Sequence, residues 1–435
     1  MRRSFLVLAL LYCLLLGGAF YWQLCADLGE HPANPRYYLV FQQDRGPIFD
    51  RQGKALAYSE ALESGYRRSY ASPSLSHVVG YFHERYGMTG LERLYHGELS
   101  AGRSLFTTLD LELQKAAEEL LGKAAGAVVA LHPATGQILA LVSAPYVDGG
   151  ALDEHWPDYR ADVRSPFLNR ATHGLYPPGS VVKPLVYGAA LAESQAEPDQ
   201  RWPDGGAWQL PGGTIRNYGG RAHGEITLDQ ALAQSSNVVF AQLAVELGDK
   251  LLEYYRLWGL GQEVQFELAN LAGFVPEGTS SQYHTAQLGI GQGELLVTPL
   301  QMAQVACALA NGGVLLRPYL VHEVRGGLRM RQITRPQVLG QALPPALAEK
   351  IKGAMVLAAQ EGTARTELSG EFAYGGKTGT AQMGSGPDHA WFIGFAPPEA
   401  PQVAVAVVIE HGGTGAQAAA PLGVELMRRA VQRSE

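Results

Sequence analysis

The hydrophobic pattern begins with one long apolar block at the start of the chain. Residues 4–26 carry no charge and directly follow Arg2 and Arg3. With its flanks the block is about long enough to cross the ~30 Å hydrocarbon core of a bilayer. The two arginines predict that its N-terminal side stays in the cytoplasm. We therefore expect residues 1–26 to form a cytoplasmic tip and a single transmembrane anchor in a cell membrane, with the remainder of the chain extracytoplasmic.

The alternative for this block is a cleaved signal peptide. A cleavage site needs small residues, whereas Tyr21 and Trp22 follow the apolar run here. Aromatic rings of this kind suit a membrane interface, so the pattern favours an anchor that is retained.

A second uncharged run, Leu295 to Leu316, is as long as a membrane span but contains several polar residues. Proline suits the first turn of a helix, and Pro299 lies near the start of this run. An Asn-Gly pair at Asn311 is a common helix end. The run therefore predicts a buried helix.

From Thr108 onward the pattern becomes regular. Thr108 is expected to cap a helix, with Asp110 in its first turn. Two β-rich runs around the turn at 132–136 predict a hairpin. Helices are expected near 181–193, 228–246, 299–310, 344–360 and 420–432, and strands at 127–131, 138–142, 372–376, 390–395 and 403–409. One strand pair early, helices in the middle and three strands late predict an α+β domain whose mostly antiparallel sheet is closed by both ends of the domain.

The segment between the anchor and this domain has a different texture. It holds many Arg, His, Tyr and Ser residues and little helical periodicity. We interpret residues 27–105 as a small membrane-proximal pedestal and residues 106–435 as one large domain.

Composition excludes several classes of protein. The 34 basic and 41 acidic residues give a net charge of −7, which argues against nucleic-acid binding because that needs clustered Lys and Arg. A hydrophobic share of 46 % excludes a disordered chain. The three cysteines form no C-x-x-C pair, so zinc-ribbon and thioredoxin-type sites are excluded. Cys307 lies in an apolar run and is expected to be a small core residue.

The first chemical motif is Ser180-Val181-Val182-Lys183, which follows a chain-breaking Pro-Pro-Gly. Residues three apart share a helix face, so the Lys183 amine can lie near the Ser180 hydroxyl. Serine is a poor nucleophile until a base accepts its proton, and a lysine can be that base when burial and positive charge lower its pKa. A lone S-x-x-K also fits an ordinary helix start with a solvated lysine.

Two further motifs favour the catalytic interpretation over an ordinary helix start. Ser235 and Asn237 form an S-x-N at the start of an apolar helix, where simple N-capping is the alternative. Lys377, Thr378, Gly379 and Thr380 lie in a strand-like run in which the lysine and hydroxyls could hold a carboxylate, and the glycine would let the backbone approach a ligand. Each motif occurs once, in the order S-x-x-K, S-x-N, K-T-G, which is typical of penicillin-binding proteins and serine β-lactamases.

The chain resembles a class B penicillin-binding protein, a monofunctional peptidoglycan D,D-transpeptidase, over nearly its whole length. The resemblance rests on the anchor, the three motifs, the Gly289-Ile290-Gly291-Gln292-Gly293 segment and an Arg45-Gly46-x-Ile48-x-Asp50-Arg51-x-Gly53 pattern. Within that family it is most similar to the short actinobacterial-type enzymes. The resemblance implies the transpeptidase fold shared with serine β-lactamases and no metal or other cofactor. It also implies two ligands, stem peptides ending in D-Ala-D-Ala and β-lactams, and a SEDS-type glycan polymerase as membrane partner.

The resemblance also implies a role for each motif residue. Ser180 would attack the penultimate D-Ala carbonyl and Lys183 would take its proton. Ser235 would pass a proton to the departing D-Ala, and Asn237 would hold the donor amide and orient the lysine. The terminal carboxylate would be bound by Lys377, Thr378 and Thr380. The oxyanion would be held by the backbone N–H groups of Ser180 and Thr380.

Three alternatives use the same motifs. A D,D-carboxypeptidase or a β-lactamase would pass the acyl group to water. A β-lactam sensor would bind without turnover, but only about three residues precede the anchor, which leaves no room for a cytoplasmic output. A catalytically dead scaffold is disfavoured by the intact motifs.

Overall fold

A computed structural model of the chain describes residues 2–22, 43–63, 65–197, 200–326, 332–384 and 386–433. Helix α1 (Arg2–Phe20) covers most of the predicted anchor, and its apolar side chains from Phe5 onward are exposed. Within the described residues no helix meets both the length and the apolarity that a membrane crossing needs. The end of the predicted anchor and the first part of the predicted pedestal, residues 23–42, lie outside the described residues.

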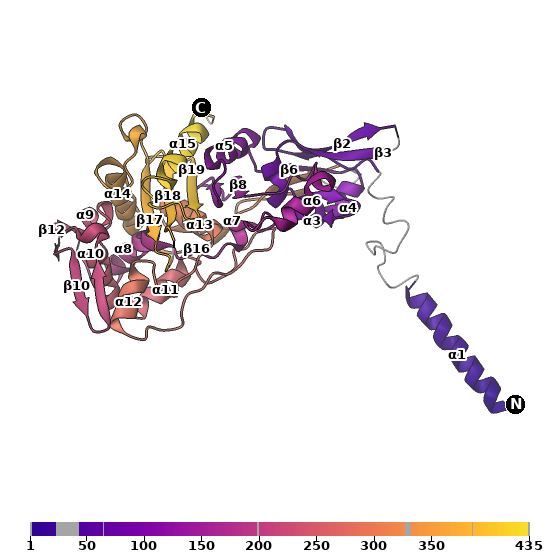
Figure 1. Ribbon diagram of the computed structural model, residues 1–435, viewed down its shortest axis with the longest axis horizontal. Coiled ribbons are helices and arrows are strands. Elements are labelled where there is room, and N and C mark those ends of the chain that lie inside the picture. The colour runs from indigo at the N-terminus through magenta and orange to yellow at the C-terminus, as the bar shows by residue number, and fades with distance from the viewer. Residues whose placement is uncertain are drawn as a thin grey trace.

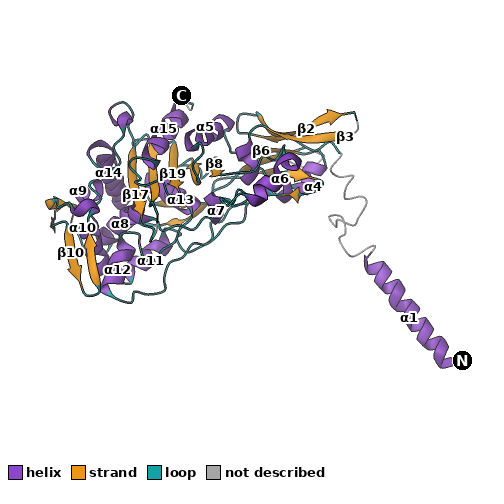
Figure 2. Ribbon diagram, viewed as in Figure 1, coloured by secondary structure: helices purple, strands orange, loops and turns teal. Residues whose placement is uncertain are grey.

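The chain after residue 43 is built on two sheets (Figures 1 and 2). The one called the smaller sheet here has six strands, but they are mostly short and hold fewer residues in total; its strand order is β15-β14-β6-β1-β2-β3. Its strands are β1 (Ile48–Phe49), β2 (Ala55–Leu62), β3 (Gly65–Tyr70), β6 (Ser104–Thr107), β14 (Val321–Arg325) and β15 (Gln332–Ile333). Two of these strands therefore come from more than 200 residues further along the chain, and β14 pairs antiparallel with β6.

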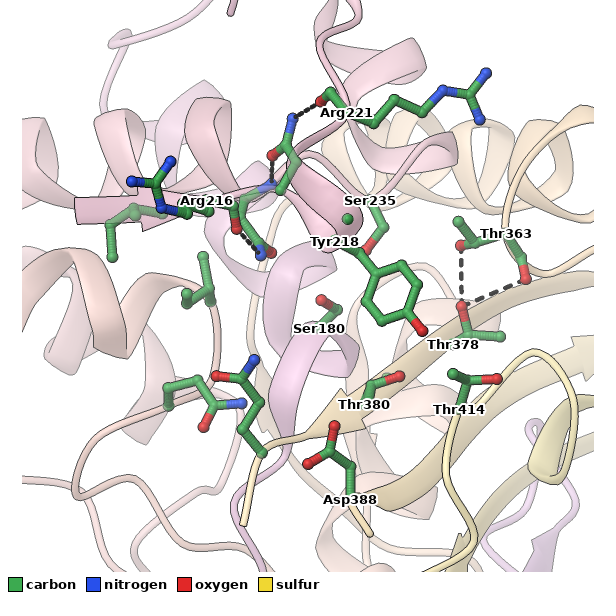
Figure 3. A pocket seen from close by; sticks show the side chains of 18 of the residues that line it. Ser180, Arg216, Tyr218, Arg221, Ser235, Thr363, Thr378, Thr380, Asp388 and Thr414 are labelled. Atoms are coloured by element: carbon green, nitrogen blue, oxygen red, sulfur yellow. Dashed lines mark hydrogen bonds between the residues drawn. The ribbon is translucent and has the colours of Figure 1, made fainter. Parts of the chain in front are cut away.

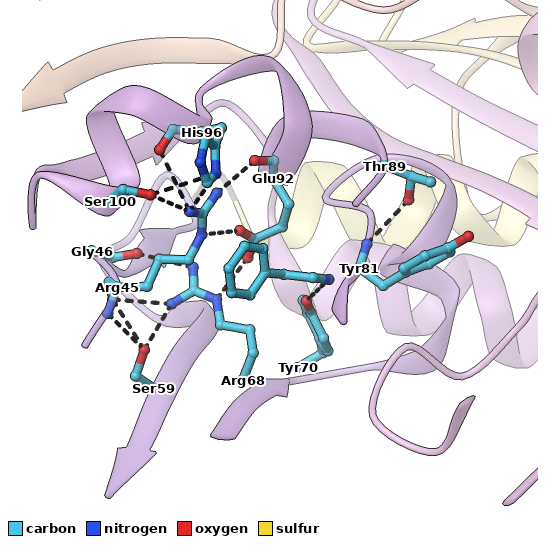
Figure 4. Close-up of polar contacts among 11 residues, drawn as sticks. Arg45, Gly46, Ser59, Arg68, Tyr70, Tyr81, Thr89, Glu92, His96 and Ser100 are labelled. Atoms are coloured by element: carbon cyan, nitrogen blue, oxygen red, sulfur yellow. Dashed lines mark hydrogen bonds and ion pairs between the residues drawn. The ribbon is translucent and has the colours of Figure 1, made fainter. Parts of the chain in front are cut away.

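A buried ion cluster lies beside this small sheet (Figure 4). Glu92, which is fully buried, accepts hydrogen bonds from Arg45 Nε at 2.6 Å and from Arg68 Nε at 2.7 Å. The two guanidinium groups also donate to backbone carbonyls, and that of Arg45 lies 4.2 Å from the centre of the Phe82 ring. Because a buried charge is costly unless it is paired, this cluster ties the segments around residues 45, 68 and 92 together.

The larger sheet is antiparallel throughout, with the order β17-β18-β19-β7-β8. Its strands are β7 (Gly126–Leu131), β8 (Ile138–Ala144), β17 (Gly375–Ala381), β18 (His389–Ala396) and β19 (Val403–Ile409). Strands from the start and the end of the domain thus meet at β7 and β19, which confirms the predicted closure. The α+β fold is as expected.

Helices cover both faces of the larger sheet, so its strands are buried on both sides. Val128 and Val407 point to a core that includes α5 (Leu111–Leu121) and α15 (Ala419–Gln432). The alternating residues Val129 and Val408 point to a second core that includes α13 (Pro299–Ala310). This second core contains Cys307, which is buried as predicted.

The remaining elements surround these two sheets. The helices and 3-10 turns are η2 (Pro73–His77), α3 (Gly90–Leu94), α4 (His96–Ser100), α6 (Leu152–Ala161), α7 (Arg170–His173), η3 (Gly179–Val182), α8 (Lys183–Ala192), η4 (Tyr218–Gly220), α9 (Leu228–Ala233), α10 (Asn237–Leu247), α11 (Lys250–Leu257), α12 (Gln282–Gly289), α14 (Pro345–Glu361) and η5 (Glu367–Gly370). The short strands are β4 (Phe82–His83), β5 (Gly87–Met88), β9 (Arg201–Asp204), β10 (Ala207–Leu210), β11 (Gly213–Arg216), β12 (Gly224–Thr227), β13 (Val314–Leu316) and β16 (Val338–Gln341).

Three sequence-based expectations about elements were wrong. Thr108 does not cap the first helix; its hydroxyl donates to the Ile138 carbonyl, and the Asp110 carboxylate caps α5 instead. The strand expected at 372–376 begins only at Gly375 and runs through the K-T-G motif. The helix expected over 228–246 is broken into α9 and α10 by a turn at 234–236.

Candidate active site

The three motifs meet in one cleft of about 810 Å³ (Figure 3). Its lining includes Ser180, Ser235, Asn237, Thr378, Gly379 and Thr380. Lys183 and Lys377 are fully buried directly behind these residues. The structure therefore brings together all eight residues that the sequence indicated, although they come from η3, α8, the turn before α10, the first residue of α10 and β17.

The serine turn is held by close backbone contacts. Gly179 has a φ of 57° and donates its N–H to the Gly291 carbonyl at 2.8 Å. A Cβ added to Gly179 would lie 2.8 Å from the Thr380 carbonyl oxygen. Glycine is needed here for both its backbone conformation and its small size. These contacts fix Ser180 between the Gly289–Gly293 segment and β17.

Replacing Gly291 with alanine is expected to displace the serine turn. Gly291 has a φ of 73°, and a Cβ there would lie 2.0 Å from the Gly179 carbonyl oxygen. The backbone must move, so we expect acylation by a penicillin to slow about 10- to 100-fold, since small misplacements of a nucleophile have such effects. Stopped-flow labelling of the variant checks this. Gly293→Ala is the control: its φ is also positive, but the nearest atom to an added Cβ is 3.7 Å away. Equal losses in both variants would contradict the packing argument.

The Lys183 amine is held by two carbonyl oxygens. Its Nζ donates to the Ser235 carbonyl at 2.8 Å and to Asn237 Oδ1 at 2.7 Å, with the Ser235 hydroxyl at 3.3 Å. Burial, and then the charge of Lys377, lowers the pKa of Lys183 well below that of a free lysine. A neutral amine has two N–H bonds, which the two carbonyl oxygens can occupy. Its lone pair then remains to accept a proton.

Within the described residues, no hydrogen bond joins Lys183 to Ser180. Catalytic hydrogen bonds are often long in a site that holds no substrate. The missing hydrogen bond between Lys183 and Ser180 is therefore compatible with the predicted proton transfer. The two residues do lie one helical turn apart, at the junction of η3 and α8.

The Ser235 hydroxyl lies between the two lysines, because Lys377 Nζ donates to it at 2.8 Å and also to the Thr378 carbonyl at 2.9 Å. Burial lowers the pKa of Lys377 to about 7. Ser235 itself has a φ of 58°, an uncommon conformation for a residue with a side chain. This conformation breaks the expected helix and turns the Ser235 carbonyl toward Lys183. Such strained residues cluster at functional sites.

Gly379 also serves a purpose that the sequence did not indicate. A Cβ at this position would lie 2.9 Å from the Pro178 carbonyl and 3.0 Å from Val181 Cγ1. The missing side chain thus lets β17 pack against the serine turn, in addition to opening the strand toward the cleft. A sequence pattern shows that the backbone needs space there but not which neighbour requires it.

Sequence reasoning missed three polar residues of the site. Thr363 forms a 2.9 Å hydrogen bond with the Thr378 hydroxyl and also lines the cleft. Asn217 accepts a hydrogen bond from the Asn237 N–H at 2.8 Å and is itself bonded to buried Asp204. These residues lie in loops and short strands without a motif, so no spacing or periodicity in the sequence indicated them. Among the described residues no group of three or more His, Cys, Asp or Glu side chains is placed to hold a metal ion.

Comparison with known families agrees with this geometry. Residues 126–428 match the penicillin-binding protein transpeptidase domain, and residues 45–119 match the penicillin-binding protein A dimerisation domain. The chain is 34 % identical to the peptidoglycan D,D-transpeptidase PbpA of Mycobacterium tuberculosis, over 99 % of this chain and 98 % of that protein. It is 33 % identical to the peptidoglycan D,D-transpeptidase MrdA of Escherichia coli, over 72 % of this chain and 56 % of MrdA.

A solved structure shows the same fold with its nucleophile acylated. The ceftriaxone acyl-enzyme complex of penicillin-binding protein A from Mycobacterium tuberculosis superposes with a TM-score of 0.85 and 31 % identity, covering 91 % of this chain and all of that one. The match extends over both the smaller and the larger sheet. The chain belongs to the class B penicillin-binding proteins.

Proposed function

We propose that this chain crosslinks peptidoglycan by D,D-transpeptidation through an acyl-enzyme on Ser180. The observation that carries the mechanism is the arrangement of the buried Lys183 amine, whose N–H bonds are taken by Ser235 and Asn237. This leaves its lone pair as the base for the Ser180 hydroxyl, which lines the cleft one helical turn away.

In the first half-reaction the Ser180 oxygen attacks the carbonyl carbon between the two D-Ala residues of a stem peptide, and Lys183 takes the hydroxyl proton. The C–N bond then breaks, and the leaving D-Ala nitrogen receives a proton from the Ser235 hydroxyl, which the adjacent lysines resupply. We assign the oxyanion to the backbone N–H groups of Ser180 and Thr380. An amine of a second stem peptide attacks the resulting ester in the second half-reaction, which forms the crosslink and returns the proton to Ser180.

The donor carboxylate is assigned to Lys377, Thr378 and Thr380. The Lys377 ammonium is buried among neutral oxygens, and a buried cation of this kind is stabilised by an arriving anion. The threonine hydroxyls face the same cleft. β-Lactams, which carry an equivalent carboxylate beside a strained amide, would acylate Ser180 by the same route.

The rate of acylation at low donor concentration is expected to follow a bell-shaped pH profile. It rises with pH as Lys183 loses its proton and becomes a base. It falls above about pH 7, because Lys377 has a pKa of about 7 and binds the carboxylate only when protonated. The fall should approach tenfold per pH unit. Measuring the profile with a donor amidated at its terminal carboxylate supplies the control, which should lack the alkaline limb; identical limbs for both donors would contradict this assignment of Lys377.

The same proposal includes the organisation of the chain. We propose residues 1–26 as a single-pass membrane anchor with its N-terminus in the cytoplasm, residues 27–105 as the pedestal and residues 106–435 as the transpeptidase domain. Exposed apolar side chains along α1 support the anchor, and the two arginines at its start support the orientation.

A crosslinking enzyme without a polymerase of its own needs newly made glycan, so we also propose a SEDS-type glycan polymerase as its membrane partner.

A product assay distinguishes crosslinking from hydrolysis. The full chain is incubated with a pentapeptide stem donor and an excess of acceptor stem, and the products are separated by mass. Transpeptidation predicts crosslinked dimer and free D-Ala in equal amounts. Release of D-Ala with only the shortened donor would mean that water is the acceptor, and the chain would then be a carboxypeptidase.

A further inference from the structure

A buried carboxylate lies behind the cleft in a position that the mechanism above does not use. Asp204 ends strand β9, and only 1 % of its surface is exposed. Its Oδ1 accepts a hydrogen bond from the Gly206 N–H at 2.9 Å. Both carboxylate oxygens accept from Asn217 Nδ2, at 2.7 and 2.8 Å. A buried charge of this kind is expensive, so its retention calls for a physical reason.

Asn217 connects this carboxylate to the catalytic helix. Its Oδ1 accepts hydrogen bonds from the N–H groups of Asn237 at 2.8 Å and Val238 at 3.1 Å, the first two residues of α10. Its Nδ2 also donates to the Arg221 carbonyl at 2.8 Å, as the dashed lines at Arg221 in Figure 3 show. The Asn217 amide is thus saturated and can take only one orientation.

The connection continues to the base. The Asn237 side chain donates through Nδ2 to the Arg216 carbonyl at 2.7 Å, which turns its Oδ1 toward Lys183 Nζ, also at 2.7 Å. Hydrogen bonds therefore link Asp204 to Asn217, Asn217 to the backbone N–H of Asn237, and the Asn237 side chain to the Lys183 amine.

Helix capping alone does not account for Asn217. Helix α10 already has a capping side chain, because the Ser236 hydroxyl accepts from the Val239 N–H at 3.1 Å. Asn217 adds bonds to the two preceding amides and, unlike Ser236, ties them to a buried charge. The arrangement is thus more than a helix start requires.

The charges around Lys183 are few. Lys377 faces it from β17 and disfavours its protonated form, whereas Asp204, from β9, favours that form and partly opposes the effects of burial. The groups that α10 and the turn before it present close to the amine are neutral, namely Asn237, the Ser235 hydroxyl and the Phe240 ring at 5.7 Å. His223 and Arg216 lie at the cleft lining near Asp204.

We propose that Asp204 and Asn217 are positioning residues of the acylation step, which orient Asn237 and Lys183 and supply a buried negative charge close to the Lys183 amine. This inference rests on the proposed function. According to this inference, the segment 204–217 helps to orient the base Lys183, although neither side chain touches the reacting atoms.

The test exchanges the carboxylate and the amide between positions 204 and 217. The variants are Asp204→Asn, Asn217→Asp and the double exchange, which restores one carboxylate opposite one amide in the reverse order. Asp110→Asn is the matched control, since Asp110 is also a buried aspartate that accepts backbone N–H groups, at the start of α5. The full chain is labelled with a fluorescent penicillin from about pH 5 to 9, and its thermal midpoint is recorded.

We expect each single variant to lose about 10-fold in plateau acylation rate, as for the loss of a charged hydrogen bond. Asp204→Asn should also move the acid limb to lower pH by about 0.5–1 unit, because the protonated lysine loses a favourable charge. The double exchange should recover the rate to within about 3-fold of the wild type and return the limb toward its original position. Asp110→Asn should keep the wild-type acylation rate and acid limb, whereas its thermal midpoint should fall because the Asp110 carboxylate caps α5 and pairs with Arg433.

Single variants with wild-type rates and an unmoved acid limb would overturn the inference, and so would losses that follow the thermal midpoint alone and are not recovered in the double exchange. A wild-type chain that is never acylated would instead refute the proposed function. The two failures are therefore separable.

Discussion

Replacing Lys183 with methionine is expected to slow the acylation of Ser180 by about 10²–10⁴-fold, the usual contribution of a general base. Methionine keeps most of the volume of the buried chain but cannot accept a proton. It also removes a buried amine that lies next to Lys377, so the thermal midpoint should not fall. The second-order rate of labelling by a penicillin measures the effect.

The control for this prediction is Lys350→Met, which changes an exposed lysine on α14 and should leave the rate unchanged. An unchanged rate in Lys183→Met would remove Lys183 as the base. A large fall in the thermal midpoint of that variant would instead attribute slow labelling to misfolding.

Replacing Glu92 with alanine is expected to destabilise the smaller sheet by about 3–5 kcal/mol, the usual cost of breaking a buried ion pair. The change leaves Arg45 and Arg68 buried without the carboxylate that holds both of them (Figure 4). Urea unfolding, followed by tryptophan fluorescence and circular dichroism, reports the shift in midpoint.

A matched control lies on the same sheet, where Glu60 pairs with Arg67 at the surface. Solvent screens an exposed pair of this kind, so Glu60→Ala should barely move the midpoint. Similar shifts in the two variants would show that the buried Glu92 cluster contributes no more to stability than an exposed ion pair does.

Local chemistry made much of the site predictable. Ser180 and Lys183 are one turn apart, so their proximity follows from helix geometry alone. The strands around 128 and 407 were recognisable as continuous apolar runs rich in valine, and such runs fit strands that are buried on both faces. The order of the three motifs then indicated that distant segments share one site.

The rest depended on contacts between remote segments. The left-handed conformation of Ser235 has no sequence signature, because serine rarely adopts it. The pairing of β14 with β6 joins residues more than 200 apart, so the smaller sheet could not be read from its own segment. Asn217 and Asp204 lie outside every motif, and only the fold brings them to α10.

Intact-mass spectrometry after incubation with a penicillin shows whether Ser180 forms the acyl-enzyme. We expect the full wild-type chain to gain the mass of one penicillin, peptide mapping to place the adduct on Ser180, and Ser180→Ala to gain no mass. A wild-type chain that stays unlabelled, or a Ser180→Ala variant that labels equally well, would contradict the role of Ser180 as the nucleophile.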